Sequence, residues 1–362
     1  MLKRLFNSIG EAYAPKSVRL NDGSASFEVA KEQTLLEAAL ASDLPFAHQC
    51  TVGTCGSCRC RLLSGTVKPL LDYSYTLTQE EVEAGYILAC QTLLKSDLVI
   101  EPPALGEQPA HPVSQHCGKV LSVARLAHDI DEVVVQLEAP LIYTAGQYAE
   151  LAITAADAVR SYSFANDCGA KGSKQVVFHI RHVEGGAVTK WLKEEAITGQ
   201  EVALRAPLGA FFLRKSEKPI LCVAGGTGLA PIEALLRQAL REQTRRPVCV
   251  LYGARSAHDL YRQDAFAELE RLWPARFRYF EALSDSTDTS TPYAQGLITD
   301  FIDAEHIGMP VADIDAYLCG PSAMIDAAVQ RLELCGVAPH NIHYDKFLES
   351  WQHQAAFAEG EQ

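Results

Sequence analysis

The sequence predicts a multi-domain chain with three folded parts: a small α+β unit, an antiparallel β-barrel and a doubly wound α/β unit. Its 362 residues are too many for one ordinary core, because domains usually have roughly 100 to 200 residues. Residues 102–115 carry four prolines without hydrophobic periodicity, which is typical of a semi-rigid linker. After Pro219 predicted strands and helices alternate, which indicates a parallel sheet.

The first part begins with a predicted hairpin whose turn is Asn21-Asp22-Gly23. Thr34 is a good N-cap for a helix that ends near Ala41, and Glu37 at the third helical position completes a capping box. A short acidic helix is expected at 79–84. The predicted strands are residues 17–20, 26–30, 59–63, 86–94 and 98–100.

The second part, from Gly118 to about Leu213, contains short apolar strands separated by glycine turns, and an antiparallel barrel is the simplest interpretation. The clearest of these strands are residues 132–137, 148–153, 161–164 and 176–181.

The third part alternates buried strands with amphipathic helices, as a doubly wound α/β fold requires. The predicted strands are residues 220–224, 248–252, 277–283 and 316–319. The predicted helices are residues 231–241, 265–272 and 322–334.

Charge and hydropathy exclude several classes of protein. Lys and Arg number 32 against 45 Asp and Glu, a net charge of −13, which argues against nucleic acid as a partner and favours a basic protein surface. No apolar run approaches the roughly 18 residues that span a bilayer, and the N-terminus lacks the apolar region of a signal peptide. We therefore expect a cytoplasmic protein.

Five of the eleven cysteines lie within 41 residues, which in a chain without an export signal favours a metal centre over disulfides. Cys50, Cys55 and Cys58 have the spacing C-x4-C-x2-C, and Cys90 follows at a distance, as in plant-type [2Fe-2S] ferredoxins. Structural zinc is the alternative, but zinc sites prefer two separated cysteine pairs. Cys60 lies on the strand that leaves the loop, and we expect it not to be a ligand.

Two motifs in the predicted barrel suit a flavin dinucleotide. Arg160-Ser161-Tyr162-Ser163 offers a cation for the pyrophosphate, an aromatic face for the isoalloxazine and a hydroxyl for its N5 edge. About 25 residues later, Gly185 and Gly186 open a helix that contains Thr189, which gives a second anion site at a helix N-terminus. Either motif alone would be weak, and together they predict FAD.

Three small or polar turns of the third part follow strands, at the sheet edge where open α/β sheets bind ligands. The first, Gly225-Gly226-Thr227-Gly228, departs from G-x-G-x-x-G because Pro231 stands at the third glycine. Tyr252-Gly253-Ala254-Arg255 ends the next strand, and Cys319-Gly320-Pro321 ends a later one. A nucleotide site is expected there.

Together and in this order, these motifs resemble the ferredoxin-NADP reductase superfamily. With the N-terminal cysteine loop, the chain is similar to the NADH-dependent reductase components of bacterial aromatic-ring or alkyl-group oxygenases, closest to the xylene monooxygenase electron-transfer type. The resemblance covers about residues 17–347. It implies a β-grasp-like [2Fe-2S] domain at 17–104, an FAD-binding barrel at 113–213 and an NAD-binding domain at 218–347.

The resemblance also implies roles for single residues. Arg160 and Thr189 would hold FAD phosphates, Tyr162 would pack on the isoalloxazine and Ser163 would contact N5. Gly226 and Gly228 would approach the nicotinamide nucleotide, and Cys319 would lie beside the nicotinamide. Asp345 and Phe347 would form the acidic and aromatic ending that shields the flavin, although the family more often has Glu at the place of Asp345.

The implied function is electron transfer from NADH through FAD and the cluster to an oxygenase, because hydride carries two electrons and a [2Fe-2S] cluster accepts one. Alternatives are another acceptor, such as a deoxysugar dehydratase or a desaturase, an iron-sulfur storage protein, and a flavohaemoglobin-like oxidase. The flavin and nucleotide motifs disfavour storage, and the turn-rich first 100 residues disfavour a globin. Asp259 favours NADH over NADPH by repelling a 2′-phosphate, whereas Arg255 could bind one.

The first fifteen residues place Leu2, Leu5, Phe6 and Ile9 at helical spacing beside two basic residues. Such a segment could rest on a membrane surface. Packing on its own protein, or disorder, is the favoured alternative, because one or two turns bury too little apolar area.

Overall fold

A computed structural model describes residues 14–42, 44, 46–48, 53, 56–102, 111–193, 197–285 and 292–347. The described chain divides into two compact units, of which one ends at Pro112 and the other is Val113–Phe347. The predicted basic segment at 1–15 lies almost wholly outside the described residues, as do Cys50 and Cys55. None of the helices in the described part is long and apolar enough to cross a membrane.

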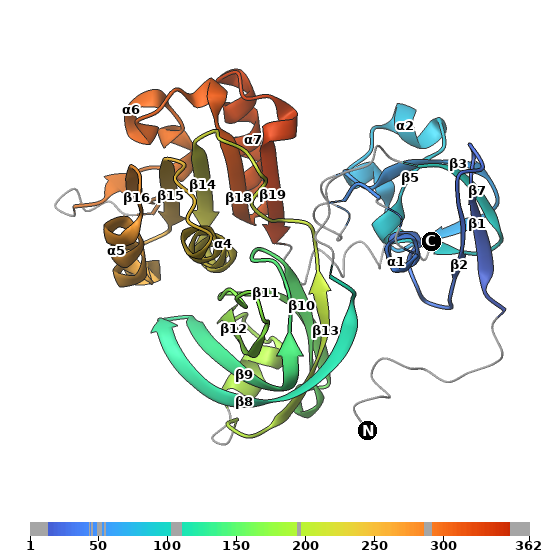
Figure 1. The fold of residues 1–362 in the computed structure, drawn as a ribbon, viewed down its shortest axis with the longest axis horizontal. Helices are drawn as coiled ribbons and strands as arrows, with labels where there is room; N and C mark the ends of the chain where they lie inside the picture. The colour runs from blue at the N-terminus through green and yellow to red at the C-terminus, as the bar shows by residue number, and fades with distance from the viewer. Residues whose placement is uncertain are drawn as a thin grey trace. The chain divides into compact units, whose positions relative to one another are not determined.

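The first unit is a five-stranded mixed sheet with a helix (Figure 1), which is the expected α+β fold. The sheet has the order β2-β1-β7-β3-β5, with β1 antiparallel to β2 and parallel to β7. A small second sheet pairs β4 with β6. The elements are β1 (Lys16–Leu20), β2 (Ser26–Val29), α1 (Leu35–Ala41), β3 (Arg59–Ser64), β4 (Val67–Pro69), α2 (Gln79–Glu83), β5 (Tyr86–Leu88), β6 (Thr92–Leu94) and β7 (Leu98–Glu101).

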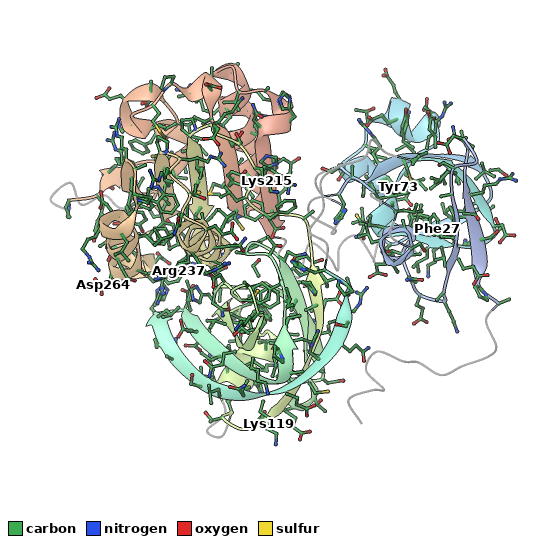
Figure 2. All side chains as sticks on the ribbon, in the orientation of Figure 1. Phe27, Tyr73, Lys119, Lys215, Arg237 and Asp264 are labelled. Carbon is green, nitrogen blue, oxygen red and sulfur yellow. The ribbon has the colours of Figure 1, made fainter. Side chains whose placement is uncertain are left out.

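Local signals in this unit act as predicted, with one exception. Thr34 caps α1 by accepting from the Glu37 amide, and the Glu37 carboxylate accepts from the Thr34 amide in return. The continuous strand predicted at 86–94 is wrong, because a 3₁₀ turn at Ala89–Gln91 separates β5 from β6. This turn carries Cys90 into the core, where Phe27 and Tyr73 also point (Figure 2).

The second unit begins with a six-stranded antiparallel sheet of order β11-β10-β13-β8-β9-β12. An isolated bridge between Phe164 and Phe178 joins the two ends of this order, so the sheet closes as the predicted barrel. Strand β11, which carries the motif Arg160-Ser161-Tyr162-Ser163, lies at one end of this order and pairs with β10. The elements are β8 (Ser114–Ala127), β9 (Ile130–Leu141), β10 (Tyr148–Ile153), β11 (Ala158–Ser163), β12 (Ser173–Arg181), α3 (Ala187–Leu192) and β13 (Glu201–Leu208).

The rest of this unit is a six-stranded parallel sheet of order β17-β16-β15-β14-β18-β19, with a hydrophobic core on each face. The chain runs outward from β14 in both directions, so the order reverses between β14 and β18 as doubly wound folds require. The elements are β14 (Ile220–Gly225), α4 (Leu229–Arg241), β15 (Val248–Ala254), α5 (Gln263–Leu272), β16 (Phe277–Leu283), β17 (Ala294–Gln295), α6 (Ala304–Ile307), β18 (Asp315–Pro321), α7 (Ser322–Leu334) and β19 (Ile342–Phe347).

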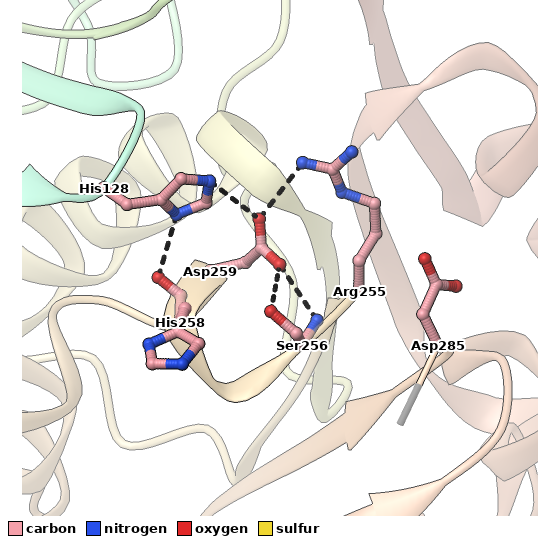
Figure 3. A pocket seen from close by; sticks show the side chains of 6 residues that line it. All are labelled: His128, Arg255, Ser256, His258, Asp259 and Asp285. Atoms are coloured by element: carbon pink, nitrogen blue, oxygen red, sulfur yellow. Dashed lines mark hydrogen bonds and ion pairs between the residues drawn. The ribbon is translucent and has the colours of Figure 1, made fainter. Parts of the chain in front are cut away.

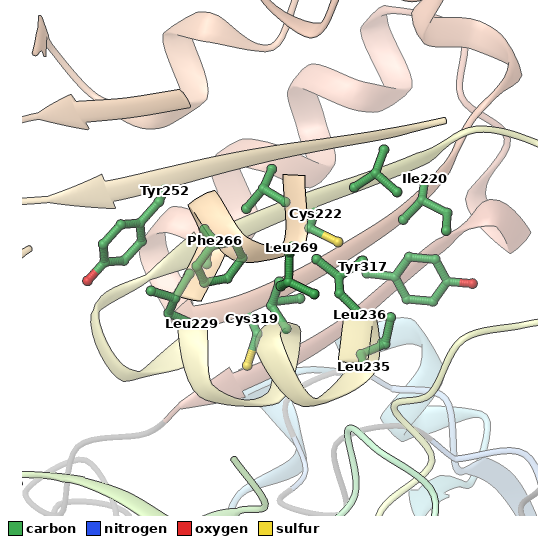
Figure 4. Close-up of a cluster of buried hydrophobic side chains, with 14 of the residues drawn as sticks. Ile220, Cys222, Leu229, Leu235, Leu236, Tyr252, Phe266, Leu269, Tyr317 and Cys319 are labelled. Carbon is green, nitrogen blue, oxygen red and sulfur yellow. The ribbon is translucent and has the colours of Figure 1, made fainter. Parts of the chain in front are cut away.

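One hydrophobic cluster joins the barrel to the parallel sheet. Ala127, Ile130 and Phe211 of the barrel belong to the same buried cluster as the side chains between the sheet and α4. Figure 4 shows the sheet side of this cluster, where Leu229 and Tyr317 lie among the buried side chains. The barrel and the parallel sheet therefore share part of their core.

A buried ion pair holds the amino-terminal end of this sheet. The Arg246 guanidinium, just before β15, donates to the Asp315 carboxylate at the start of β18 at 2.6 Å, and both side chains are about 95% buried. Arg246 also donates to the carbonyl oxygens of Arg214 and Lys218. These contacts satisfy charges whose burial without partners would be costly.

Candidate functional site

Two of the four predicted cluster ligands are described, and the fold brings them together. Cys58 just before β3 and Cys90 in the 3₁₀ turn lie 32 positions apart in sequence, yet their Sγ atoms are 3.2 Å apart. Both are buried and neither forms a disulfide. The Cys90 amide also donates to the Cys58 sulfur at 3.5 Å, the kind of contact that stabilises a thiolate ligand.

Two described glycines near these thiols have the left-handed backbone that suits a tight cluster loop. Gly53 has φ +85°, and a Cβ there would lie 2.6 Å from Gln91 Cγ. Gly56 is also left-handed, with φ +70°. Two buried thiols with packed glycines suit a metal-sulfur centre, and the assignment of Cys50 and Cys55 as its other ligands stays a prediction.

Cys60 has surroundings different from those of a ligand. It lies on β3 opposite Ile87, belongs to the hydrophobic core and is 1% exposed. Burial raises the pKa of its thiol strongly, and the neighbouring Cys58 raises it further. A protonated thiol in an apolar core is inert.

The predicted flavin motif lies on strand β11. Arg160 and Ser161 are exposed, while Tyr162 and Ser163 are half-buried. Tyr162 packs against the barrel core, with its ring centre 6.3 Å from that of Phe178. A partly exposed strand with a cation, an aromatic ring and two hydroxyls fits the groups that FAD needs, and the role of each stays a prediction.

The second flavin motif forms the tight turn before α3. Gly185 has φ +72°, and Gly186 is the N-cap residue of the helix. The buried Thr189 hydroxyl accepts a hydrogen bond from the Val183 amide at 2.7 Å. Its own proton stays available to donate, so the predicted phosphate contact is compatible with this bond.

The three predicted nucleotide turns meet at the carboxyl edge of the parallel sheet. Gly228 lies against β18 so closely that a Cβ would be 2.1 Å from the Cys319 carbonyl oxygen. Gly225 and Gly320 also touch: a Cβ on Gly320 would lie 2.8 Å from the Gly225 oxygen. Thr227 belongs to the 3₁₀ turn Gly226–Gly228, which connects β14 to α4. This is the reversal point of the strand order, where such sheets bind nucleotides.

Strand register brings the predicted nicotinamide residues to the same edge. Cys319 pairs with Ala224 on one side and with Asp345 on the other, and Pro321 pairs with Phe347. Cys319 is fully buried, and burial followed by the charge of Asp345 raises the pKa of its thiol well above its ordinary value. A neutral, fully buried thiol therefore lies beside the buried Asp345 side chain at this edge.

A cavity of about 480 Å³ opens beyond the end of β15, where Tyr252, Gly253 and Arg255 were expected to contact the nucleotide. Its lining is charged and polar (Figure 3): His128, Arg255, Ser256, His258, Asp259 and Asp285. Tyr252 is buried in the core behind it, and Gly253 packs on Ile298. Of the three, Arg255 is the one that lines the cavity.

Sequence reasoning missed the barrel's contribution to this cavity. His128 lies in the turn between β8 and β9, and its Nδ1 is 3.2 Å from the His258 carbonyl oxygen. Asp129 beside it and Arg181 at the end of β12 form ion pairs with residues that follow β15. The partners of each ion pair are more than 70 positions apart in sequence, so no local sequence pattern predicts these pairs, and only the fold reveals them.

Comparisons with protein families agree with the order of these sites. Three family models match the chain: a 2Fe-2S iron-sulfur cluster binding domain at residues 18–95, an oxidoreductase FAD-binding domain at 118–213 and an oxidoreductase NAD-binding domain at 222–330.

Similar proteins extend over nearly the whole chain. The xylene/toluene monooxygenase electron transfer component XylA of Pseudomonas putida is 36% identical over 350 residues, which are 96% of this chain and 98% of that protein. The reductase subunit of an Amycolatopsis aromatic O-demethylase is 36% identical over 321 residues, which are 87% of this chain and 94% of that one. The crystal structure of the Amycolatopsis cytochrome P450 reductase GcoB matches with a TM-score of 0.79 and 35% identity, and covers 92% of this chain and 98% of its own. The chain thus belongs to the family of NAD-dependent flavin and iron-sulfur reductases that serve as electron-transfer components of oxygenases.

Proposed function

We propose that this chain carries electrons from NADH, by way of FAD and a [2Fe-2S] cluster, to an oxygenase or hydroxylase protein in the cytoplasm. The observation that carries the proposal is the succession of the three cofactor domains in one chain that aligns end to end with oxygenase electron-transfer components. The relatives compared above are named for oxygenase or demethylase systems or for a cytochrome P450, which favours such an acceptor over a dehydratase or a desaturase.

In this proposal each fold supplies one kind of chemistry. FAD, when bound, exchanges electrons either in pairs or singly, which lets a hydride donor serve a one-electron cluster. Arg160 and Thr189 would hold its phosphates, and Tyr162 and Ser163 its ring system. Hydride transfer needs positioning rather than a strong acid or base, and the neutral Cys319 thiol beside the nicotinamide site suits that requirement.

The electrostatics of the chain fit a protein acceptor. The net charge of −13 favours docking on a basic surface and disfavours nucleic acid. The proposal needs no membrane contact.

The test compares two cysteine variants, Cys90→Ala and Cys60→Ala, to separate the activity of the flavin from that of the cluster. We expect Cys90→Ala to lose the visible absorbance of the cluster and the anaerobic reduction of cytochrome c, while NADH oxidation by ferricyanide persists because ferricyanide accepts electrons from the flavin. Cys60→Ala is the matched control, because it removes a neighbouring buried thiol that is not a predicted ligand. It should keep the absorbance, both activities and about two irons per chain.

Two results would contradict this proposal. Equal loss of both activities in Cys90→Ala would mean that flavin and cluster do not act in series. Loss of the cluster in Cys60→Ala, with the fold intact, would mean that the ligand assignment is wrong.

A further inference from the structure

Four charged side chains near the cavity form a closed ring of alternating sign. Arg181 Nε lies 3.1 Å from Asp129 Oδ2, and Arg181 Nη2 lies 4.0 Å from Asp259 Oδ1. Arg255 Nη2 closes the ring at 3.2 Å from Asp259 Oδ1 and 3.9 Å from Asp129 Oδ2. The ring is neutral as a whole, and each arginine faces two carboxylates.

The ring spans two parts of the fold. Asp129 and Arg181 come from the barrel, whereas Arg255 and Asp259 follow strand β15. Arg181 also lies against the glycine-rich turn, since a Cβ on Gly226 would be 2.9 Å from its Nη1. The ring therefore connects the turn expected to hold the coenzyme phosphates with the cavity beyond β15.

This cavity is where the adenosine end of the coenzyme belongs. In doubly wound folds the residues after the second strand contact the ribose 2′ position, through an acid for NADH or a cation for a 2′-phosphate. Arg255 lines the cavity with 60% of its side chain exposed, so a 2′-phosphate has access to it. A 2′-phosphate would thus compete with the carboxylates of the ring for the Arg255 guanidinium, whereas NADH, which lacks that phosphate, would not.

Asp259 cannot release Arg255 easily. Its side chain is 5% exposed, and its Oδ2 accepts hydrogen bonds from the amide and hydroxyl of Ser256. Burial raises the pKa of Asp259, but these bonds and Arg255 outweigh it, so the net shift is downward and the carboxylate is charged at neutral pH. One partner of Arg255 is therefore fixed within its own turn.

Asp129 supplies the second negative charge from the barrel. Its side chain is 18% exposed, and its Oδ2 faces both arginines of the ring. Its Oδ1 has no hydrogen-bond partner among the described residues and lies 3.8 Å from His128 Nδ1. A carboxylate at this depth is screened less by salt than one in open solvent.

We propose that Asp129 is a positioning residue for coenzyme choice: together with Asp259 it holds Arg255 between two carboxylates, which denies a 2′-phosphate its cation and favours NADH over NADPH. This inference rests on the proposed function and adds a specificity determinant on the flavin barrel, outside the nucleotide-binding sheet.

The test neutralises Asp129 and measures both turnover and binding. In Asp129→Asn we expect the ratio of kcat/KM for NADPH to that for NADH, with ferricyanide as acceptor, to rise about tenfold, the usual effect of one charge-assisted hydrogen bond. The change should lie in KM for NADPH and leave kcat alone. By calorimetry, 2′,5′-ADP should bind about tenfold more tightly, while 5′-AMP, which lacks the 2′-phosphate, should not change.

Further variants show whether the effect acts through Arg255. Adding Arg255→Ala should abolish the gain in 2′,5′-ADP affinity of Asp129→Asn, whereas Arg255→Ala alone should weaken that affinity less than about twofold. Asp129→Glu should restore the original ratio. Asp157→Asn, which neutralises an exposed carboxylate elsewhere on the barrel at a left-handed position that Asn accepts, should leave the ratio unchanged.

The inference is overturned if Asp129→Asn leaves the coenzyme ratio and 2′,5′-ADP affinity unchanged, or if its gain survives Arg255→Ala. A tenfold loss of 2′,5′-ADP affinity in Arg255→Ala alone would overturn it too, even if Asp129→Asn does not fold. Failure of the proposed function is a different result: the unmodified chain would not oxidise NADH with ferricyanide, whereas the 2′,5′-ADP measurements need no turnover.

Discussion

His343 on strand β19 is a buried histidine with an unusually weak affinity for protons. It stacks on Tyr317 with ring centres 5.1 Å apart, and its Nδ1 has no hydrogen-bond partner among the described residues. Burial is the main cause that lowers its pKa to about 4, and the charges of Arg214 and Arg246 lower it further. The folded protein therefore keeps this imidazole neutral at pH values where an unfolded chain protonates it.

This difference predicts a pH-dependent loss of stability. Between pH 6.5 and about 4 the unfolded chain binds the proton that folded His343 refuses, so the free energy of unfolding falls as the pH falls. The full decrease in the free energy of unfolding is about 3 kcal/mol, since each unit of pKa difference between the folded and unfolded states corresponds to roughly 1.4 kcal/mol. His343→Phe keeps the ring stack and cannot titrate, so its thermal midpoint should fall less than that of the unmodified chain from pH 7 to pH 4.5. Parallel pH curves for the two proteins would disprove this origin.

Among the elements, the contact between the glycine-rich turn and β18 has the least tolerance for change. A Cβ on Gly228 would meet the Cys319 carbonyl oxygen at 2.1 Å and the Gly320 nitrogen at 2.8 Å, and these are backbone atoms that cannot turn aside. In Gly228→Ala the turn must move off β18, which distorts the nucleotide edge and leaves the barrel intact.

We therefore expect Gly228→Ala to retain FAD and to raise KM for NADH about tenfold or more, which corresponds to the 1–3 kcal/mol typical of overpacking. Gly169→Asn is the control, because its backbone is left-handed with φ +64°, nothing lies within 4 Å, and Asn tolerates this conformation. Loss of FAD together with NADH binding, or an unchanged KM, would show that the contact of Gly228 with β18 does not specifically shape the nucleotide edge. Stopped-flow reduction of the flavin measures the effect.

Most elements could be predicted because their signals are local. The capping box of Thr34 and Glu37, and the alternation of buried strands and helices after Pro219, need no knowledge of distant residues. The 3₁₀ turn at Cys90 was missed because Ala89-Cys90-Gln91 contains no Gly, Pro, Asn, Asp or Ser that would indicate a turn. Strand β19 was not identified as a strand, since only its pairing with β18 distinguishes it from a loop.

The candidate site was predictable to a similar degree. The turns after β14, β15 and β18 could be recognised in the sequence by their small and polar residues. Parallel strands place their carboxyl ends at one edge of the sheet. Asp129 is an ordinary charged residue of the turn between β8 and β9, and Arg181 is one at the end of β12. Their ion pairs with Arg255 and Asp259 depend on how the barrel packs on the sheet.

On the scale of the whole molecule, the cores predict where the chain can be divided. The buried core of the first unit is drawn from residues 18–100, whereas the cluster that contains Ala127, Ile130 and Phe211 also includes the sheet and α4. A cut near residue 110 therefore leaves each unit its own core, and a cut near residue 216 opens a shared one.

We expect the fragment 111–362 to fold, bind FAD and oxidise NADH with ferricyanide at a kcat within about twofold of the full chain, as a domain with its own core should. The fragment 218–362 should aggregate, because it exposes the apolar surface that Ala127, Ile130 and Phe211 cover. Size-exclusion chromatography and flavin content distinguish the two. A soluble, monomeric 218–362 would show that the shared cluster is dispensable.

The buried pair of Arg246 and Asp315 has a consequence for directed evolution. It lies at the amino-terminal end of the parallel sheet, while the glycine turns, Cys319 and Arg255 lie at the carboxyl end. Removing one member of such a pair typically costs about 3–5 kcal/mol, a large share of a domain's stability. A mutant library aimed at new coenzymes is therefore best confined to the carboxyl end of the sheet. Substitutions at Arg246 and Asp315 would unfold the protein and would not change its coenzyme specificity.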